Sequence, residues 1–250
     1  MSTLALAATH ARYNLVETSR VPIAVLGSLV FPSLAFCLFV LPQPAVRGSA
    51  EFATAALCSM VVFAFMSAGL FSLGIELAEQ RAKPWAPYLR TLPGAASARI
   101  LGLLSATLVI SVTAMVPLLV IGGLFTQARP EPLDALGAMA LAVVTAAPSG
   151  LIGILIGTLT GPKAAIAVTQ VAMFLLAFGG GLFLPPQLFP RWLDVASAFL
   201  PVRQAREIVV NVALGTAVPL WAVIGIVAWT LVLSLVAVIA YRRDEGRRYR

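Results

Sequence analysis

The chain has 250 residues, of which 60% are hydrophobic and only 11% are charged, and its mean hydropathy is +0.97. An ordinary soluble domain carries about 25% charged residues, because polar side chains must cover its surface. This composition excludes a soluble globular protein and predicts an all-α integral membrane protein. The net charge of +7 would favour nucleic-acid binding in a soluble protein. In a membrane protein, the distribution of basic residues between the two sides of the membrane is the first explanation to test.

The first predicted element is an amphipathic helix over residues 4–20. Its apolar stripe consists of Leu4, Ala8, Ala11 and Leu15. Its other faces carry His10, Arg12, Asn14 and Glu17. Such a helix lies either on the lipid surface or against a protein partner.

Six apolar runs are long enough to cross a bilayer core of about 30 Å, which needs roughly 20 helical residues. We therefore predict one domain over residues 1–250 with six transmembrane helices, at 23–41, 52–75, 100–125, 133–159, 164–184 and 219–241. The first run exceeds the usual apolar core of a signal peptide, about 7–15 residues. We interpret it as a retained span. The two cysteines, Cys37 and Cys58, fall inside apolar runs and are expected to be buried thiols, although a bridge between neighbouring helices stays open.

Basic residues divide unequally between the two sides of this topology. With both termini cytoplasmic, that side holds twelve of the 17: Arg12, Arg20, Arg81, Lys83, Arg90, Arg99, Lys163, Arg242, Arg243, Arg247, Arg248 and Arg250. The other side holds Arg47, Arg129, Arg191, Arg203 and Arg206. This bias follows the positive-inside rule and predicts a multi-pass membrane protein with both termini in the cytoplasm. The net charge is thereby explained without nucleic acid, and the basic C-terminal tail is expected to contact lipid headgroups.

The six runs contain no ionisable side chain apart from Asp134 at the edge of the fourth. Ion-coupled transporters generally place such groups at depth, because the groups carry the coupling ion. Membrane hydrolases need carboxylates or histidines near one interface, and no paired acidic or Cys/His motif occurs here. The sequence therefore predicts no catalytic residue, no metal site and no cofactor in this chain, and energy supplied by another protein.

The segment 79–99, EQRAKPWAPYLRTLPGAASAR, interrupts this apolar pattern on the predicted cytoplasmic side. Residues 76–81 are expected to continue the second span as a helix. Pro84 and Pro87 then suit the first turn of a new short helix. Its apolar stripe is Trp85, Tyr88, Leu89 and Leu92. Such a helix either lies among lipid headgroups or docks its aromatic residues on a soluble partner.

The connection between the last two spans is long and predicts two further amphipathic helices. In the first, apolar residues recur at helical spacing until Pro201 breaks the run: Phe189, Trp192, Leu193, Ala196, Phe199 and Leu200. The second would bury Val202, Ala205, Ile208, Val209 and Val212, and Gly215 would end it. An ordinary loop packed on the lipid surface is the alternative.

The order of these segments resembles the ABC type-2 exporter permeases over essentially the whole chain. The loop between spans two and three matches the family pattern of an acidic–basic cluster, a short coupling helix and a proline stop. The matching residues are Glu76, Glu79, Arg81, Leu89, Thr91, Leu92 and Pro93. A Gly-Thr pair that is frequent in the family is absent, and Lys83-Pro84-Trp85 occupies its region, so the start of the coupling helix is not fixed.

The resemblance implies an N-terminal interface helix, a cytoplasmic coupling helix and re-entrant external helices between spans five and six. It also implies a separate ATPase subunit that binds ATP and Mg, and a second permease copy or a sister permease. The nearest approach to a phosphate-binding loop, GTLTGPKA at 157–164, has the wrong spacing. Its glycines, Gly153, Gly157 and Gly161, are expected to let helices pack closely.

The resemblance assigns roles to two sets of residues. The ATPase-coupling residues would be Glu76, Glu79, Arg81, Lys83, Trp85, Tyr88, Leu89 and Arg90. The substrate pathway would be lined by Phe31, Phe36, Phe63, Phe65, Thr169, Gln170, Phe174 and Phe178. The expected function is export of a hydrophobic or amphipathic substrate, with drug or antibiotic efflux first. The alternatives are lipid or glycan export by the same type of transporter, a non-transport membrane-anchor subunit and a gradient-driven carrier.

Overall fold

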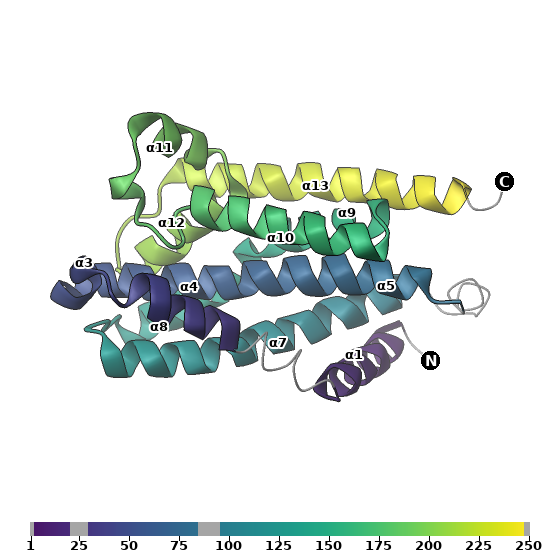
Figure 1. Cartoon of the computed structure of the whole chain (residues 1–250), viewed down its shortest axis with the longest axis horizontal. Helices are drawn as coiled ribbons and strands as arrows, with labels where there is room; N and C mark the ends of the chain where they lie inside the picture. The colour runs from purple at the N-terminus through teal and green to yellow at the C-terminus, as the bar shows by residue number, and fades with distance from the viewer. Residues whose placement is uncertain (1–2, 21–29, 85–95, 248–250) are drawn as a thin grey trace.

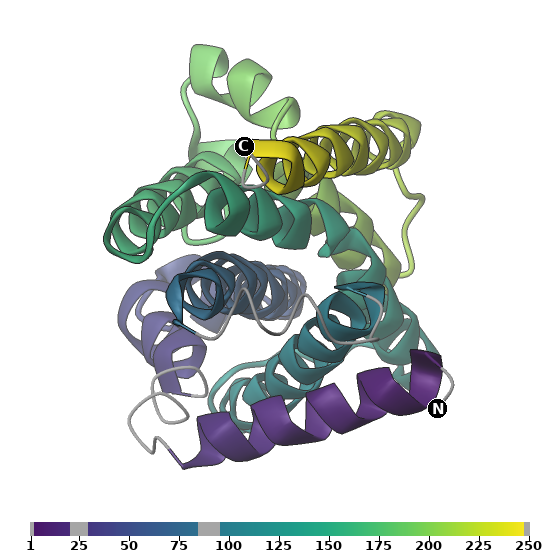
Figure 2. The ribbon, with the colours of Figure 1, turned by 90° about the vertical axis from the view of Figure 1, so that its right-hand side faces the viewer.

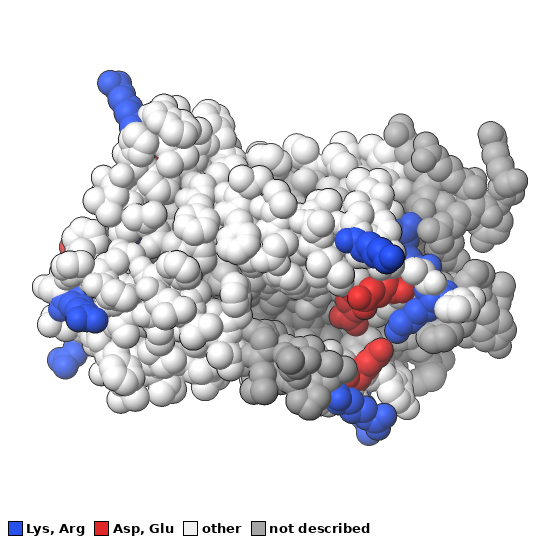
Figure 3. Space-filling view, in the orientation of Figure 1, with Lys and Arg blue, Asp and Glu red and all other residues white. Residues whose placement is uncertain are grey.

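The computed structural model describes residues 3–20, 30–84 and 96–247, and the regular elements among them are all helices (Figure 1). Most of the long helices run roughly parallel to the long axis of the molecule. One end, which we call the α5 end, carries α5, α1 and the last turns of α13. The other, the α11 end, carries α3, α11 and the beginning of α8. A broad band without charged side chains separates the two ends on the face shown in Figure 3. This arrangement fits helices that cross a membrane along the long axis.

The centre of the bundle is one continuous helical rod. Helix α4 (Ala50–Phe71) begins at the cap residue Ser49, passes through one π-helical turn, η2 (Ser72–Glu76), and continues as α5 (Leu77–Ala82). Its 33 residues correspond to about 50 Å at 1.5 Å per residue, which exceeds the hydrocarbon core of a bilayer. The predicted helical continuation of the second span is therefore confirmed, and it ends where Lys83 turns extended before a proline.

Four further helices are long and apolar enough to cross a membrane, which makes five among the described residues. They are α7 (Ala96–Phe125), the pair α8 (Pro132–Thr145) and α9 (Ala147–Leu159), α10 (Pro162–Gly179) and α13 (Leu220–Arg247). Of the predicted first span, 23–41, residues 23–29 lie outside the described residues. The remainder forms a short helix, Val30–Val40, that includes the π-helical η1 (Phe36–Val40). The count of six spans stays a prediction.

The predicted span 133–159 matches one helical segment, Pro132–Leu159, that is long and apolar enough to cross a membrane. Its helix is interrupted at Ala146, because Pro148 in the first turn of α9 has no N–H for a continuous helix. One predicted span boundary is wrong. The run 164–184 ends as a helix at Gly179, and Gly181 adopts a left-handed φ of 73° that reverses the chain. Residues 182–184 therefore lie beyond the helix, although their apolar character made them part of the predicted span.

Helix α1 (Thr3–Ser19) packs along the first turns of α7, at the edge of the bundle (Figure 2). The contact is close, because a Cβ atom on Gly102 would lie 2.5 Å from the Cβ of His10 and 3.0 Å from the Ala7 carbonyl oxygen. The predicted N-terminal helix is present. Its position on a membrane interface stays a prediction.

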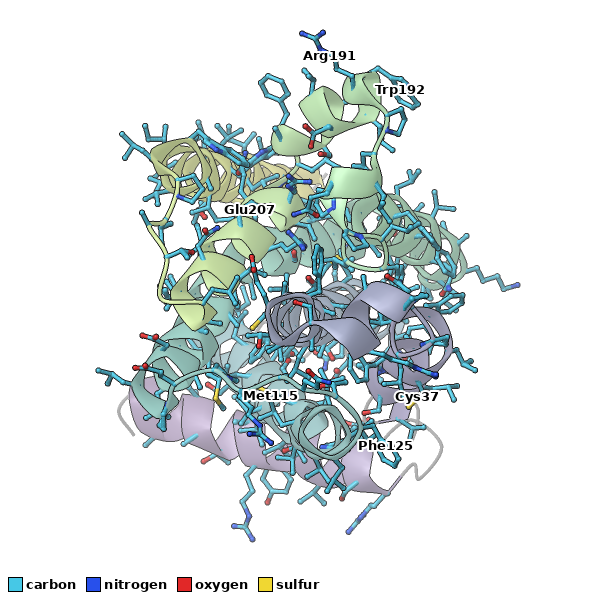
Figure 4. The ribbon with its side chains drawn as sticks, turned by 90° about the vertical axis from the view of Figure 1, so that its left-hand side faces the viewer. Cys37, Met115, Phe125, Arg191, Trp192 and Glu207 are labelled. Carbon is cyan, nitrogen blue, oxygen red and sulfur yellow. The ribbon has the colours of Figure 1, made fainter. Side chains whose placement is uncertain are left out.

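The two helices predicted after the fifth span are also present. Helix α11 (Arg191–Ala198) projects from the molecule and α12 (Pro201–Ala213) packs against α4, α8 and α13. Arg191 and Trp192 point away from the body of the molecule (Figure 4), and Trp192 is 71% exposed. In α12 the predicted positions Val202, Ala205, Ile208 and Val209 are buried, whereas Val212 is only partly buried. Gly215, with φ of 63°, follows the end of α12. Both cysteines are free thiols: Cys58 is buried and Cys37 half-buried.

Candidate functional site

The predicted coupling residues lie at the α5 end as far as the structure describes them. Trp85, Tyr88, Leu89 and Arg90 lie outside the described residues. Glu76, Glu79, Arg81 and Lys83 occupy the last turns of η2 and α5 and the residue that follows. Their roles in coupling stay predictions, but their contacts can be described.

Arg81 joins the central rod to α9. Its Nη1 donates to the carbonyl oxygens of Gly157, at 2.6 Å, and Thr158, at 2.5 Å. These carbonyls belong to the last turn of α9, where the helix dipole favours a positive charge. A displacement of α5 would therefore act on α9 as well as on α4.

The rod and α9 also touch through their backbones. A Cβ atom on Gly153 would lie 2.5 Å from the Gly69 carbonyl oxygen, and one on Gly157 would lie 2.8 Å from the carbonyl oxygens of Leu73 and Gly74. The close approach predicted for Gly153 and Gly157 is confirmed. For Gly161 it is wrong, because no atom lies within 4 Å of its Cβ position and the residue precedes α10 as an N-cap.

A cavity of about 670 Å³ lies beside the rod toward the α5 end. Residues from α1, the Val30–Val40 helix, α4, η2, α5, α7 and α10 line it. Phe31 and Gln170, both predicted to line a substrate pathway, lie in its wall with Glu76, Glu79 and Lys83. On the face shown in Figure 3, acidic side chains gather in a hollow near the α5 end, with basic side chains around them. We call this space the α5-end cavity.

The predicted pathway phenylalanines form a chain of ring contacts that the sequence did not indicate. Phe63 lies 5.7 Å from Phe31 and 5.0 Å from Phe183, and Phe178 lies 5.0 Å from Phe183 and 6.3 Å from Phe174, measured between ring centroids. Phe183, which lies beyond the end of α10, connects the Phe31–Phe63 contact with the Phe174–Phe178 contact. No sequence signal marked it, because it stands in an unbroken apolar run.

Three further predicted pathway residues are buried inside the bundle. Phe36 and Thr169 are fully buried and Phe65 nearly so. Thr169 faces the rod, since its Oγ1 would lie 2.9 Å from a Cβ on Gly74. Phe174 and Phe178 are each 44% exposed on α10. The structure therefore gathers Phe31 and Gln170 around the α5-end cavity and distributes the other six elsewhere.

A buried charge cluster lies toward the α11 end. Arg206 on α12 is only 4% exposed; its Nε donates to Ser59 Oγ of α4 at 2.9 Å and its Nη1 to Glu207 Oε1 at 3.0 Å. Arg203 Nε also lies 3.0 Å from Glu207 Oε1. Burial lowers the pKa of Arg206, and the neighbouring Glu207 opposes that change.

The predicted spans lack charged side chains apart from Asp134 at the edge of the fourth. Helix α12, from the connection between the last two spans, nevertheless brings Arg206 against Ser59, the tenth residue of α4. The signal in the sequence was the spacing of Arg203 and Glu207, one helical turn apart on the polar side of an amphipathic helix. Among the described residues, no group of three or more His, Cys, Asp or Glu side chains could hold a metal ion.

Comparison with known proteins identifies one relative in Bacillus subtilis (strain 168), the "Putative transport permease YvfS". It is 26% identical over 145 residues, which cover 58% of this chain and 59% of the relative, less than two thirds of its length. No family model matches the chain. This similarity supports the resemblance to the ABC type-2 permeases. Together with the apolar helices, it supports a multi-pass membrane transport permease.

Proposed function

We propose that this chain is the permease subunit of an ATP-driven ABC exporter in the bacterial cytoplasmic membrane, with both termini cytoplasmic. It forms the transmembrane pathway for a hydrophobic or amphipathic substrate and serves drug or antibiotic efflux. A separate ATPase subunit binds ATP and Mg, and a second permease copy or a sister permease completes the pathway. The chain itself carries out no covalent chemistry.

The continuous rod α4–η2–α5 is the observation that carries this proposal. It extends from the α11 end to Lys83, immediately before the segment whose residues match the family's coupling helix. A force delivered to the end of α5 reaches the centre of the bundle through one continuous helix. Arg81 and the glycine contacts pass the same force to α9.

The mechanism follows from this connection. ATP binding closes two ATPase subunits, and the coupling segment moves with their surface. Trp85, Tyr88 and Leu89 anchor the contact, and Glu79, Lys83 and Arg90 form its charged rim. The rod and α9 then shift together and open the pathway toward the other side of the membrane. Coupling is the difference in contact free energy between the two states.

Replacing the two aromatic anchors tests the proposal. In proteoliposomes that contain the chain and its ATPase, Trp85→Ala/Tyr88→Ala should lower the permease-stimulated ATP hydrolysis about tenfold, because aromatic anchors dominate such contacts. Trp192→Ala/Phe199→Ala is the matched control, since both residues are 71% exposed on α11 or just after it. It should leave the hydrolysis rate unchanged.

Two results would contradict the proposal. If the Trp85→Ala/Tyr88→Ala variant assembles and stimulates ATP hydrolysis as the unaltered chain does, the coupling assignment is wrong. If the chain alone transports substrate uphill without nucleotide, it is a gradient-driven carrier. A chain that co-purifies with proteins other than an ATPase and supports no transport would be a membrane-anchor subunit.

A further inference from the structure

The α5-end cavity has an apolar wall and an acidic opening, and this combination indicates the charge of its ligand. We propose that the cavity binds the exported substrate and that this substrate is a cationic amphiphile: an amine or quaternary cation on an apolar body. The inference deepens the proposed export function and rests on it.

The size and wall of the cavity fit a drug-sized apolar body. Its volume of about 670 Å³ lies within the range of roughly 300–1,000 Å³ for small-molecule sites. The apolar part of the wall consists of Phe31, Pro32, Ala68, Phe71, Ile75, Ile110, Ala114 and Met173. Two of these side chains are aromatic rings, whose faces attract cations as well as apolar groups.

The charged groups in the lining favour a cation. The lining contains three carboxylates, Glu17, Glu76 and Glu79, and one ammonium group, Lys83. Lys83 Nζ lies 3.4 Å from Glu17 Oε1, so its positive charge first offsets the negative charge of Glu17. Arg81 is directed to the end of α9. Two carboxylates therefore remain to set the sign of the local field.

The two remaining carboxylates have few partners of their own. Glu76 Oε1 accepts a hydrogen bond from Gln80 Nε2 at 3.1 Å, and neither Glu76 nor Glu79 forms an ion pair with another described residue. Glu76 is only partly exposed, and a charge beside apolar walls acts through a lower effective dielectric than in water. A cation in the cavity would supply the missing partner, whereas an anion would be repelled.

Polar groups deeper in the cavity can orient such a ligand. Gln170, on α10, lines the wall, and its amide forms no hydrogen bond with another described residue. Ser67 and Ser72 add hydroxyl groups to the wall formed by α4 and η2. A few polar groups in a mostly apolar wall are typical of sites that fix ligand orientation.

The test compares two ions of similar shape and opposite charge, tetraphenylphosphonium and tetraphenylborate. Binding to the purified full chain in detergent micelles is measured by equilibrium dialysis against protein-free micelles. The chain should bind tetraphenylphosphonium at least about tenfold more tightly than tetraphenylborate, and Glu76→Gln/Glu79→Gln should remove most of that preference. Glu131→Gln/Asp134→Gln, at and near the start of α8 at the α11 end, is the matched control and should retain it.

A further variant separates charge from shape. Phe31→Ala should weaken binding of both ions, because it removes apolar wall without changing charge. Equal affinity for the two ions in the unaltered chain would overturn the proposal, as would undiminished phosphonium binding in a folded Glu76→Gln/Glu79→Gln variant. Because dialysis requires neither ATP nor the ATPase, this result is independent of the coupling test. A chain that fails here but still drives ATP-dependent export exports a substrate of another charge class.

Discussion

Arg206 is the single residue whose burial most clearly sets a stability requirement. Its guanidinium lies between Ser59 of α4 and Glu207 of α12, and it is 4% exposed. Removing one partner of a buried hydrogen-bonded ion pair costs about 3 kcal/mol when the other partner is left without compensation. Because Arg203 stays beside Glu207, this value is an upper limit for Arg206. We therefore expect Arg206→Ala to lower the melting temperature of the purified chain, measured by thermal unfolding in detergent.

The surrounding residues provide graded controls for this prediction. Ser59→Ala removes one hydrogen bond and should cost about 1 kcal/mol. Arg191→Ala changes an exposed arginine on α11 and should stay within about 0.5 kcal/mol of the unaltered chain. If Arg206→Ala is no less stable than Arg191→Ala, the buried pair does not hold α12 against α4.

At the scale of elements, the contact between the rod and α9 depends on glycine. A methyl group at position 153 would meet the Gly69 carbonyl oxygen at 2.5 Å, which is backbone and cannot rotate away. Gly153→Ala should therefore force the two helices apart and destabilise the chain by about 2 kcal/mol. Unfolding by heat or denaturant in detergent measures this loss.

A second glycine separates the packing effect from helix propensity. Gly123 lies inside α7 with no atom within 4 Å of its Cβ position. Gly123→Ala should leave stability unchanged or raise it by about 0.5–1 kcal/mol, because alanine restricts the unfolded chain. If Gly153→Ala shows the same gain, the two helices tolerate a wider separation than the structure indicates.

Elements with strong periodicity could be predicted from the sequence, whereas breaks inside apolar runs could not. The period of 3.6 residues indicated α12, and Pro201 and Gly215 marked its limits. The division at Ala146 and the end of α10 at Gly179 lie within runs of uniform hydropathy. Hydropathy measures the solvent that a segment prefers and carries no information on where its backbone turns.

The same distinction applies to the candidate site. The acidic residues after the second span were marked by their order along the chain, and Phe31 and Gln170 by the family resemblance. Their meeting around one cavity depends on how α1, α4, α7 and α10 pack. The contacts of Phe183 and Arg206 could be identified only in the structure, because their partners lie on other helices.

For the whole molecule, the orientation of the two ends across the membrane can be tested directly. The unequal division of basic residues predicts that the α5 end lies in the cytoplasm and the α11 end outside. Lys163, in the first turn of α10, and Arg191, on α11, are both exposed and lie on opposite sides of this topology. A single cysteine at either position would therefore report the side directly.

The experiment uses a chain whose native thiols are replaced by Cys37→Ala/Cys58→Ala. In intact spheroplasts, a membrane-impermeant maleimide should label the Arg191→Cys variant and spare the Lys163→Cys variant. In inverted membrane vesicles the pattern should reverse, because the cytoplasmic face is then exposed. Labelling of Lys163→Cys in spheroplasts would show that the orientation is the reverse of the predicted one. The α5-end cavity and the coupling segment would then face away from ATP, and an ATPase on the cytoplasmic side could no longer reach the rod through Lys83.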